Sequence, residues 1–257
     1  MTQPIKVLTY NIHKGFGPGN LSFALHEIRS RIELSGADIV FLQEIHGQHA
    51  KREATVPGWP KGSQFEFLAD RAWPHHAYGK NAIYKAGHHG NAILSRYPFE
   101  RWDNINVSRY TRASRSILHG VIRTAHDVPL HVLCIHFDFV PHHRRPQVDA
   151  LVERIQTHIP AGEPLIVAGD FNDWEGKVTA DLAPDSELAE VFHTLRGKHA
   201  RTFPAWLPAL SLDRIYYRGL EPLRCKRMRD RPARRLSDHL ALYAEFGLAG
   251  ARRQAAD

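Results

Sequence analysis

The sequence has few of the features that mark disulfide-bonded or membrane-spanning proteins. It contains two cysteines in 257 residues, Cys134 and Cys225, at a spacing that matches no zinc or redox motif. Both lie in apolar, strand-like runs, so we expect buried thiols and a reducing compartment, the cytoplasm. No apolar run approaches the roughly 18 residues needed to span a bilayer. The N-terminal stretch MTQPIKVLTYN also lacks the basic and apolar regions of a signal peptide.

The sequence also lacks internal repeats and any linker rich in Pro, Gly or Ser that would separate two domains. We therefore expect a single domain over residues 1–246, a disordered tail over 247–257 and a monomer. Charge is unbalanced, with a formal net charge of +7 and a sequence pI of about 9.5. This balance favours an anionic partner, and nucleic acid, anionic lipid and small phosphates all fit it.

Apolar runs predict more strands than helices. Buried strands are predicted at residues 5–10, 38–43, 91–97, 116–125, 130–137, 163–169, 212–217 and 240–246. A long polar surface loop is predicted at 46–62. Many strands with few helices predict two sheets packed face to face with helices outside.

Two segments show the apolar spacing of a helix. The first is 21–34, and the second is 144–159, with Pro146 placed in its first turn. The apolar positions are Leu21, Leu25, Ile28 and Ile32 in the first, and Val148, Leu151, Val152, Ile155 and Ile159 in the second.

Polar side chains recur at the ends of the predicted strands. A single Asn or Asp in such a place is usually a turn former, and a single His on an apolar strand usually belongs to the core. Their joint occurrence instead predicts an active site along one edge of the sheets. The set comprises Asn11, Glu44, His136, Asp138, Asp170, Asn172, Asp213, Asp238 and His239.

The ordered set Asn11, Glu44, His136, Asp170-Phe171-Asn172, Asp213 and Ser237-Asp238-His239 resembles the endonuclease/exonuclease/phosphatase (EEP, DNase I-like) family of Mg²⁺-dependent phosphohydrolases. The stretches NIHKGF (11–16) and GHHGNAILSRYP (87–98) resemble an uncharacterised bacterial subgroup of it. The resemblance implies an α+β fold, a four-layer α-β-β-α sandwich of two packed, mostly antiparallel sheets. The site would then lie where the two sheets meet at one end.

The resemblance also implies a metal cofactor, Mg²⁺, for which Mn²⁺ could substitute. Mg²⁺ prefers oxygen ligands and keeps several waters, so one or two carboxylates suffice. Glu44 is the first choice as ligand, and Asn11 and Asp238 would orient the ion directly or through water.

Catalytic roles follow from the same resemblance. Asp170 would position and deprotonate the attacking water, while Asn172 and His136 would donate hydrogen bonds to phosphate oxygens. His239 would lie against the scissile phosphate, and Asp213 would hold that imidazole and raise its pKa. The predicted reaction is hydrolysis of a phosphodiester or phosphomonoester in nucleic acid, a phospholipid or a small molecule.

Alternatives remain open from the sequence alone. The chain could be a catalytically silent module that binds nucleic acid or anionic membrane. A zinc hydrolase is a second alternative, because the sequence contains the pairs His75-His76, His88-His89 and His142-His143. Two observations weigh against it: adjacent residues on a strand point to opposite faces, and the sequence has no HExxH motif. Asp138 could support His136 or lie on the surface.

Two further stretches admit more than one interpretation. Residues 224–235 carry seven Lys or Arg in twelve positions and lead into Ser237. They could dock phosphates beyond the scissile one or form a solvated strand and turn. Residues 202–213 carry Phe203, Trp206 and Leu207, which could stack on bases, contact lipid chains or fill the core.

Overall fold

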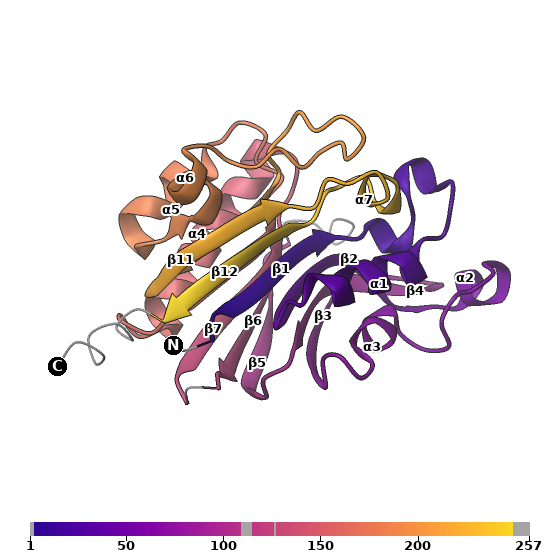
Figure 1. Cartoon of the computed structure of the whole chain (residues 1–257), viewed down its shortest axis with the longest axis horizontal. Coiled ribbons are helices and arrows are strands. Elements are labelled where there is room, and N and C mark those ends of the chain that lie inside the picture. The colour runs from indigo at the N-terminus through magenta and orange to yellow at the C-terminus, as the bar shows by residue number, and fades with distance from the viewer. Residues whose placement is uncertain (1–2, 109–114, 126, 249–257) are drawn as a thin grey trace.

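The computed structural model describes residues 3–108, 115–125 and 127–248, and two six-stranded sheets dominate it (Figure 1). The first sheet has the order β11-β12-β1-β2-β4-β3, and the second has the order β5-β6-β7-β8-β10-β9. The first sheet comprises β1 Ile5–Asn11, β2 Ile39–His49, β3 His75–Tyr84, β4 Gly87–Ser95, β11 Leu220–Arg227 and β12 Leu242–Leu248. The second comprises β5 Phe99–Asn106, β6 Ser116–Arg123, β7 Pro129–His136, β8 Leu165–Asp170, β9 Ala189–Glu190 and β10 Asp213–Arg218.

Most neighbouring strands in both sheets are antiparallel. The exceptions are the pairs β1 with β2 and β7 with β8, which are parallel. Parallel strands need a crossover connection, and α1 (Leu25–Ser35) and α4 (Pro141–His158) supply it in these two units. The prediction of two packed, mostly antiparallel sheets is confirmed.

Three apolar clusters show the layers of the molecule. The largest, which includes Val7, Phe41 and Ile166, joins the facing surfaces of the two sheets. A second packs α1 and α3 (Gln64–Ala69) on the outer face of the first sheet. A third packs α4 and α5 (Val178–Ser186) on the outer face of the second. The order helix, sheet, sheet, helix is the sandwich implied by the resemblance.

The predicted surface loop at 46–62 was wrong in its first half. Strand β2 continues to His49 because β4 pairs with it as far as His49 and Gly87, and the short helix α2 (Ala50–Thr55) follows directly. The side chain of His49 accepts a hydrogen bond from the backbone N–H of Arg52 and so starts that helix.

The starts of the two predicted helices also move. Helix α1 begins at Leu25, and Leu21 is 90% exposed outside it. Helix α4 begins at Pro141, which occupies the first turn and leaves Pro146 inside the helix. The carboxylate of Asp138 accepts from the N–H of Val140 just before Pro141, which favours the earlier start.

The C-terminal tail and the two cysteines can be compared with their predictions. The predicted tail from residue 247 overlaps the end of β12, and residues 249–257 lie outside the described residues. Both cysteines are buried free thiols, as predicted.

None of the helices in the described part of the chain is long and apolar enough to cross a bilayer. The remaining short helices are α6 (Val191–Arg196), α7 (Ala233–Leu236) and the 3₁₀ turns His13–Gly15 and Pro18–Asn20.

Candidate active site

Strand register brings the polar residues of the second sheet together. His136 on β7 pairs with Asp170 on β8, and Asp170 pairs with Asp213 on β10. Residues paired in register on adjacent strands have neighbouring side chains. In the first sheet, β1 ends at Asn11 next to Gln43 of β2. The predicted residues therefore meet at one edge of the two facing sheets.

Asp170 is the central acceptor of this edge. Its Oδ2 accepts a hydrogen bond from Nδ2 of Asn11 across the two sheets, at 3.0 Å. Its Oδ1 accepts from the backbone N–H of Asn172 at 2.9 Å. The same Oδ2 lies 3.6 Å from Nε2 of His136 and 3.7 Å from Nε2 of His239. Burial raises the pKa of Asp170 to about 6, against the lowering effect of His239.

His239 forms a buried pair with Asp213, the contact that the resemblance implies. Its Nδ1 lies 2.8 Å from Oδ2 of Asp213. Burial alone would lower the pKa of His239, but the carboxylates of Asp213 and Asp170 outweigh it and raise that pKa to about 10. The imidazole is therefore a cation between two acids near neutral pH.

Glu44 sits on a bulge in β2. Between the pairs Leu42 with Ala92 and Ile45 with Gly90, two residues of β2 face one of β4. Glu44 has φ 55°, a conformation uncommon for a residue with a side chain. Such bulges redirect a side chain next to many active sites. Burial would raise the pKa of Glu44, but electrostatic interactions with His136 and Lys14 hold it well below its usual range.

Lys14 is a site residue that the sequence interpretation missed. Its Nζ lies 2.5 Å from Oε2 of Glu44. Lys14 lies in the 3₁₀ turn His13–Gly15, which follows Asn11 at the end of β1. The backbone N–H of His13 donates to Oδ1 of Asn11 and fixes this turn. The signal was present in the motif NIHKGF, directly after Asn11.

Ser237 ties the segment before His239 to the first sheet. Its hydroxyl donates to the carbonyl of Asn11 at 2.7 Å and accepts from the N–H of His239 at 3.2 Å. Asp238 beside it lies at the edge, with Oδ1 3.8 Å from Nδ1 of His13. The 3₁₀ turn therefore contacts Glu44 with the side chain of Lys14, and it approaches Asp238 with the side chain of His13.

Asn172 is held in place through its side-chain amide and through its backbone carbonyl, which a buried arginine contacts. It has φ 49°, and its Nδ2 donates to the carbonyl of Phe137, which leaves one amide hydrogen for a ligand. Its carbonyl accepts from Arg144 at 2.7 Å. Arg144, which the sequence interpretation also missed, donates in addition to the carbonyls of Asp138 and Phe139.

Asp138 does not support His136. Its backbone N–H donates to Gln147, and its carboxylate accepts from Val140 at the start of α4. It therefore belongs to the turn that leads into this helix.

A metal site can be tested against the donor atoms present. Among the described residues, ligand atoms of Asp170, Asp213 and His239 lie within 4.8 Å of one another. A protonated His239 cannot donate a lone pair, so this group suits a metal less well than its spacing indicates. The Glu44 carboxylate already binds a cationic group, the Lys14 ammonium, and with Asn11 and Asp238 it offers hard oxygen ligands. These residues fit a divalent cation.

Comparisons with known proteins show the family of this chain. The model of the Endonuclease/Exonuclease/phosphatase family matches residues 8–239. The chain belongs to this family. It is 43% identical over 244 residues to the uncharacterized protein YbhP of Escherichia coli (strain K12), covering 95% of this chain and 96% of YbhP.

Solved structures of EEP proteins share the fold at low identity. The endonuclease/exonuclease/phosphatase from Beutenbergia cavernae DSM 12333 aligns with a TM-score of 0.79 and 19% identity, covering 97% of this chain and 73% of its own. D. rerio TDP2, solved with a single strand DNA product, aligns with a TM-score of 0.70 and 19% identity, covering 96% and 100%. At these identities the likeness shows the EEP fold alone.

Exposed aromatic side chains border the candidate site on two sides. Trp174 follows Asn172 closely in the chain and stacks on Phe139, at a ring distance of 6.3 Å. On the other side, Phe203 lies against His239 with ring centroids 5.0 Å apart. Beyond it Trp206 is 61% exposed, and the N–H of Ala205 donates to the carbonyl of Asp238. The loop at 202–213 thus contacts the site while leaving Trp206 free to meet a ligand.

Proposed function

We propose that this protein is a Mg²⁺-dependent phosphodiesterase that also accepts Mn²⁺. Members of its family are typically hydrolases acting on phosphodiesters and other phosphate esters. The observation that carries the proposal is the juxtaposition of Asp170 and His239, a buried acid and a buried imidazolium at one edge of the sheets. Such a pair suits a reaction in which a proton leaves water while negative charge grows on phosphate.

Asp170 takes the role of general base. With a pKa raised to about 6 by burial, it is ionised at neutral pH and still basic enough to accept a proton from water. Asn11 and the N–H of Asn172 fix the orientation of its carboxylate. General base catalysis of this kind typically contributes about 10²–10⁴-fold to the rate.

His239 and Asn172 take the role of anion stabilisers. The imidazolium remains charged because Asp213 accepts its Nδ1 proton, which leaves the Nε2 proton for a phosphate oxygen. Neutral His136 offers a further donor, because burial and the charge of Arg115 keep its pKa well below the usual range. Removing one preorganised donor of this kind typically costs about 2.7–4 kcal/mol of barrier.

Glu44, Asn11 and Asp238 would hold the metal ion. When bound, Mg²⁺ supplies a Lewis acid that polarises the phosphoryl oxygen. The low pKa of Glu44 keeps its carboxylate charged and available over the whole working range of pH.

Hydrolysis of bis(p-nitrophenyl) phosphate tests the proposal. Purified protein with Mg²⁺ or Mn²⁺ should release p-nitrophenol, EDTA should stop release, and added Mg²⁺ should restore it. Asp170→Asn should lower kcat at least about 10²-fold, and Glu44→Gln should raise the metal concentration needed for half-maximal rate. The exposed Glu53→Gln on α2 is the matched control. Undiminished hydrolysis in EDTA would sink the metal assignment, and full activity of Asp170→Asn would sink the general base.

A further inference from the structure

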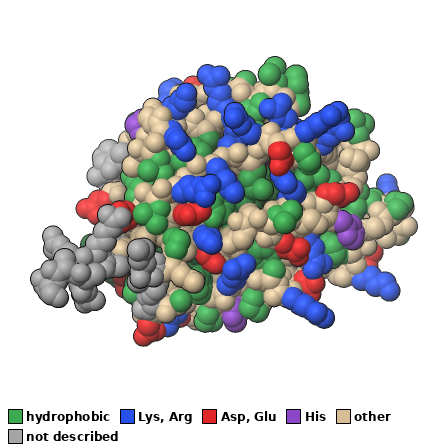
Figure 2. Space-filling view, viewed as in Figure 1, with side chains coloured by type: hydrophobic (Ala, Val, Ile, Leu, Met, Phe, Trp, Pro, Cys, Tyr) green, Lys and Arg blue, Asp and Glu red, His purple; other side chains and the backbone are tan. Residues whose placement is uncertain are grey.

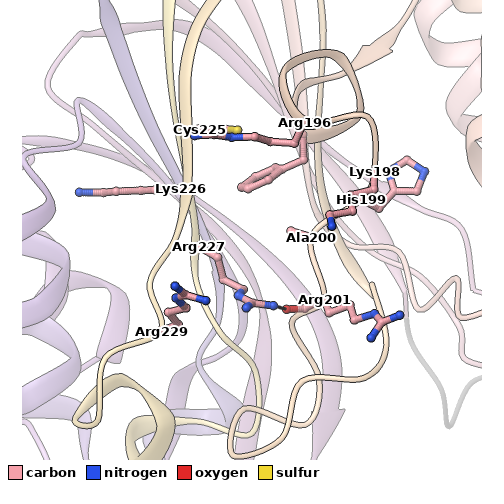
Figure 3. Close-up of a pocket in the computed structure, with 10 residues that line it drawn as sticks. Arg196, Lys198, His199, Ala200, Arg201, Cys225, Lys226, Arg227 and Arg229 are labelled. Carbon is pink, nitrogen blue, oxygen red and sulfur yellow. Dashed lines mark hydrogen bonds between the residues drawn. The ribbon is translucent and has the colours of Figure 1, made fainter.

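A basic groove runs along the open side of the sandwich, beside the catalytic edge. One wall is the segment from Phe192 in α6 to Arg201, and the other is β11 with the following residues to Arg229 (Figure 3). Its volume is about 660 Å³, within the ~300–1,000 Å³ typical of ligand sites. In Figure 2, Lys and Arg side chains spread over the upper half of the face on which β11, β12 and α7 lie in Figure 1.

The side chains that line this groove carry one sign of charge. Arg196, Lys198 and Arg201 lie on one wall, and Arg227 and Arg229 lie on the other, whereas no lining residue is acidic. Lys226 also lines it but turns away from the groove (Figure 3), with its ammonium 4.6 Å from the ring centroid of Tyr243.

One hydrogen bond joins the two walls and leaves other cations unpaired. Arg227 donates to the carbonyl of Arg201, and Arg196 of one wall lies beside Cys225 of the other (Figure 3). Within the described part of the chain, the side chains of Lys198, Arg201 and Arg229 make no hydrogen bond or ion pair. Burial and the positive charges of Arg229, Arg234 and Arg201 lower the pKa of Arg227. A bound anion would relieve this repulsion.

One end of the groove adjoins the catalytic edge. Arg201 precedes Thr202, whose hydroxyl accepts from the N–H of Asp213 and whose carbonyl accepts from the N–H of Leu240. On the other wall, Arg227 pairs in register with Leu242 at the start of β12. The backbone thus connects the groove directly to Asp213 and His239, and the exposed Trp206 lies on the loop that begins at Thr202.

We propose that this groove binds the phosphodiester backbone of a single-stranded nucleic acid whose scissile phosphate lies at the catalytic edge. The inference rests on the proposed function and names its substrate class. Cations on two facing walls suit successive phosphates of a chain better than one small anion. A base next to the scissile phosphate can stack on Trp206, as bases do on the aromatic platforms of single-strand binding proteins.

Binding without turnover tests the groove directly. The probe is a fluorescein-labelled oligothymidylate of about 12 nucleotides, within the ~4–16 nucleotides of typical single-strand sites, and fluorescence anisotropy is read in EDTA. The test variant is Lys198→Ser with Arg201→Ser and Arg229→Ser, side chains whose loss breaks no hydrogen bond or ion pair within the described structure. The control is Lys51→Ser with Lys61→Ser and Lys85→Ser, which removes the same charge from exposed positions near α2 and the β3–β4 turn.

We expect the groove variant to bind the oligonucleotide at least about tenfold more weakly than the wild type. The slope of log K against log salt should fall by up to about 2, at ~0.7 for each lost phosphate contact. The control should retain wild-type affinity, and bis(p-nitrophenyl) phosphate, too short to reach the groove, should be hydrolysed equally by all three proteins. Equal oligonucleotide binding by the groove variant and the control would overturn the proposal.

Two further outcomes separate the groove from the proposed function. If the wild type binds the oligonucleotide but hydrolyses no ester, and the groove variant loses this binding, the groove is supported and the catalytic role is rejected. Binding to phosphatidylglycerol vesicles, without binding to the oligonucleotide, would overturn the groove's assignment to nucleic acid.

Discussion

The ammonium of Lys14 lies 2.5 Å from the carboxylate of Glu44, the side chain that we assign to the metal. Both groups are largely shielded, with side-chain exposures of 28% and 20%. A divalent cation and the Lys14 ammonium cannot both bind the same Glu44 oxygen at full strength. On one oxygen they would lie at most about 5 Å apart, where charges of +2 and +1 repel by about 7 kcal/mol at an effective dielectric constant of 20. Lys14 is therefore a competitor for the metal position.

Replacing Lys14 should strengthen metal binding. Lys14→Met keeps the apolar stem and removes the charge, so Mn²⁺ affinity measured by calorimetry should rise roughly tenfold, about 1.4 kcal/mol. If Lys14 also contacts the bound phosphate, kcat should fall in the same variant. Lys80→Met, an exposed lysine on β3, is the control. Unchanged Mn²⁺ affinity in Lys14→Met would show that the metal does not bind at Glu44.

The pairing of Asp213 with His239 predicts a shift in the pH profile. The pKa of His239 is raised to about 10 against an ordinary value of 6.5. His239 therefore stays charged below about pH 10 and loses its proton as the pH rises through that value. The stability that its ion pair with Asp213 contributes is lost over the same range. Asp213→Asn removes the carboxylate that sustains the shift, so loss of kcat/KM on the alkaline side should begin at lower pH.

A double-mutant cycle separates this pairing from independent roles. Once His239→Ala has removed the imidazole, adding Asp213→Asn should cost little more, because the two residues act as a unit. The measurement is kcat/KM for the wild type, both single variants and the double variant across pH. Barrier increases that add, with no shift of the alkaline limb in Asp213→Asn, would rule the pairing out.

The positions of strand ends could be predicted from the sequence, whereas the contacts between them could not. Apolar runs before His136 and Asp170 placed these residues at one sheet edge, and register then made them neighbours. Lys14 was missed because its contact with Glu44 depends on a short turn that no periodic pattern marks. The bulge that directs Glu44 appears only when β4 pairs with β2.

Other errors have similar local causes. Pro141 and Pro146 each fit a first helical turn, and the contact from Asp138 to Val140 decides for the earlier one. Strand β5 was not predicted because six of its eight residues are exposed and its apolar side chains are sparse. Arg144 resembled a surface residue in the basic start of α4, yet it is 3% exposed.

Arg144 should be essential for the turns that carry Asp138 and Asn172. Its guanidinium donates to three backbone carbonyls, of Asp138, Phe139 and Asn172. Arg144→Ala would leave these three buried carbonyls without their donor and remove one of the two arginines beside the Asp173 carboxylate. We expect a loss of about 3–5 kcal/mol in the free energy of unfolding in urea. Arg145→Ala, at the exposed neighbouring position, should cost less than about 0.5 kcal/mol. Similar unfolding midpoints for the two variants would contradict the buried role of Arg144.

A chain of neutral imidazoles far from the active site should make the protein sensitive to acid. Nε of Arg154 donates to Nδ1 of His119, so Nε2 of His119 carries the hydrogen that it shares with Nδ1 of His131 at 2.9 Å. Nε2 of His131 then donates to Glu163 at 2.6 Å. Protonation of His119 would place a hydrogen on Nδ1 and break its contact with Arg154.

The pKa of His119 gives the direction of this effect. Burial, followed by the positive charge of Arg154, lowers the pKa of His119 to about 3, while the unfolded chain binds that proton near pH 6.5. The unfolded state therefore holds more protons between these values, and stability falls as pH drops below about 6.5. From pH 7 to pH 5 this histidine alone should cost about 2 kcal/mol of unfolding free energy.

Urea titrations at pH 7 and pH 5 measure this contribution as a difference between variants. His119→Gln keeps a side chain that can accept from Arg154 and donate to His131, but it cannot titrate. Its loss of unfolding free energy between the two pH values should be about 2 kcal/mol smaller than that of the wild type. His158→Gln, an exposed histidine at the end of α4, should keep the wild-type difference. If His119→Gln and the wild type lose the same amount, His119 is already charged in the folded protein or is not buried as a neutral imidazole, and the direction of proton donation inferred from Arg154 to Glu163 is wrong.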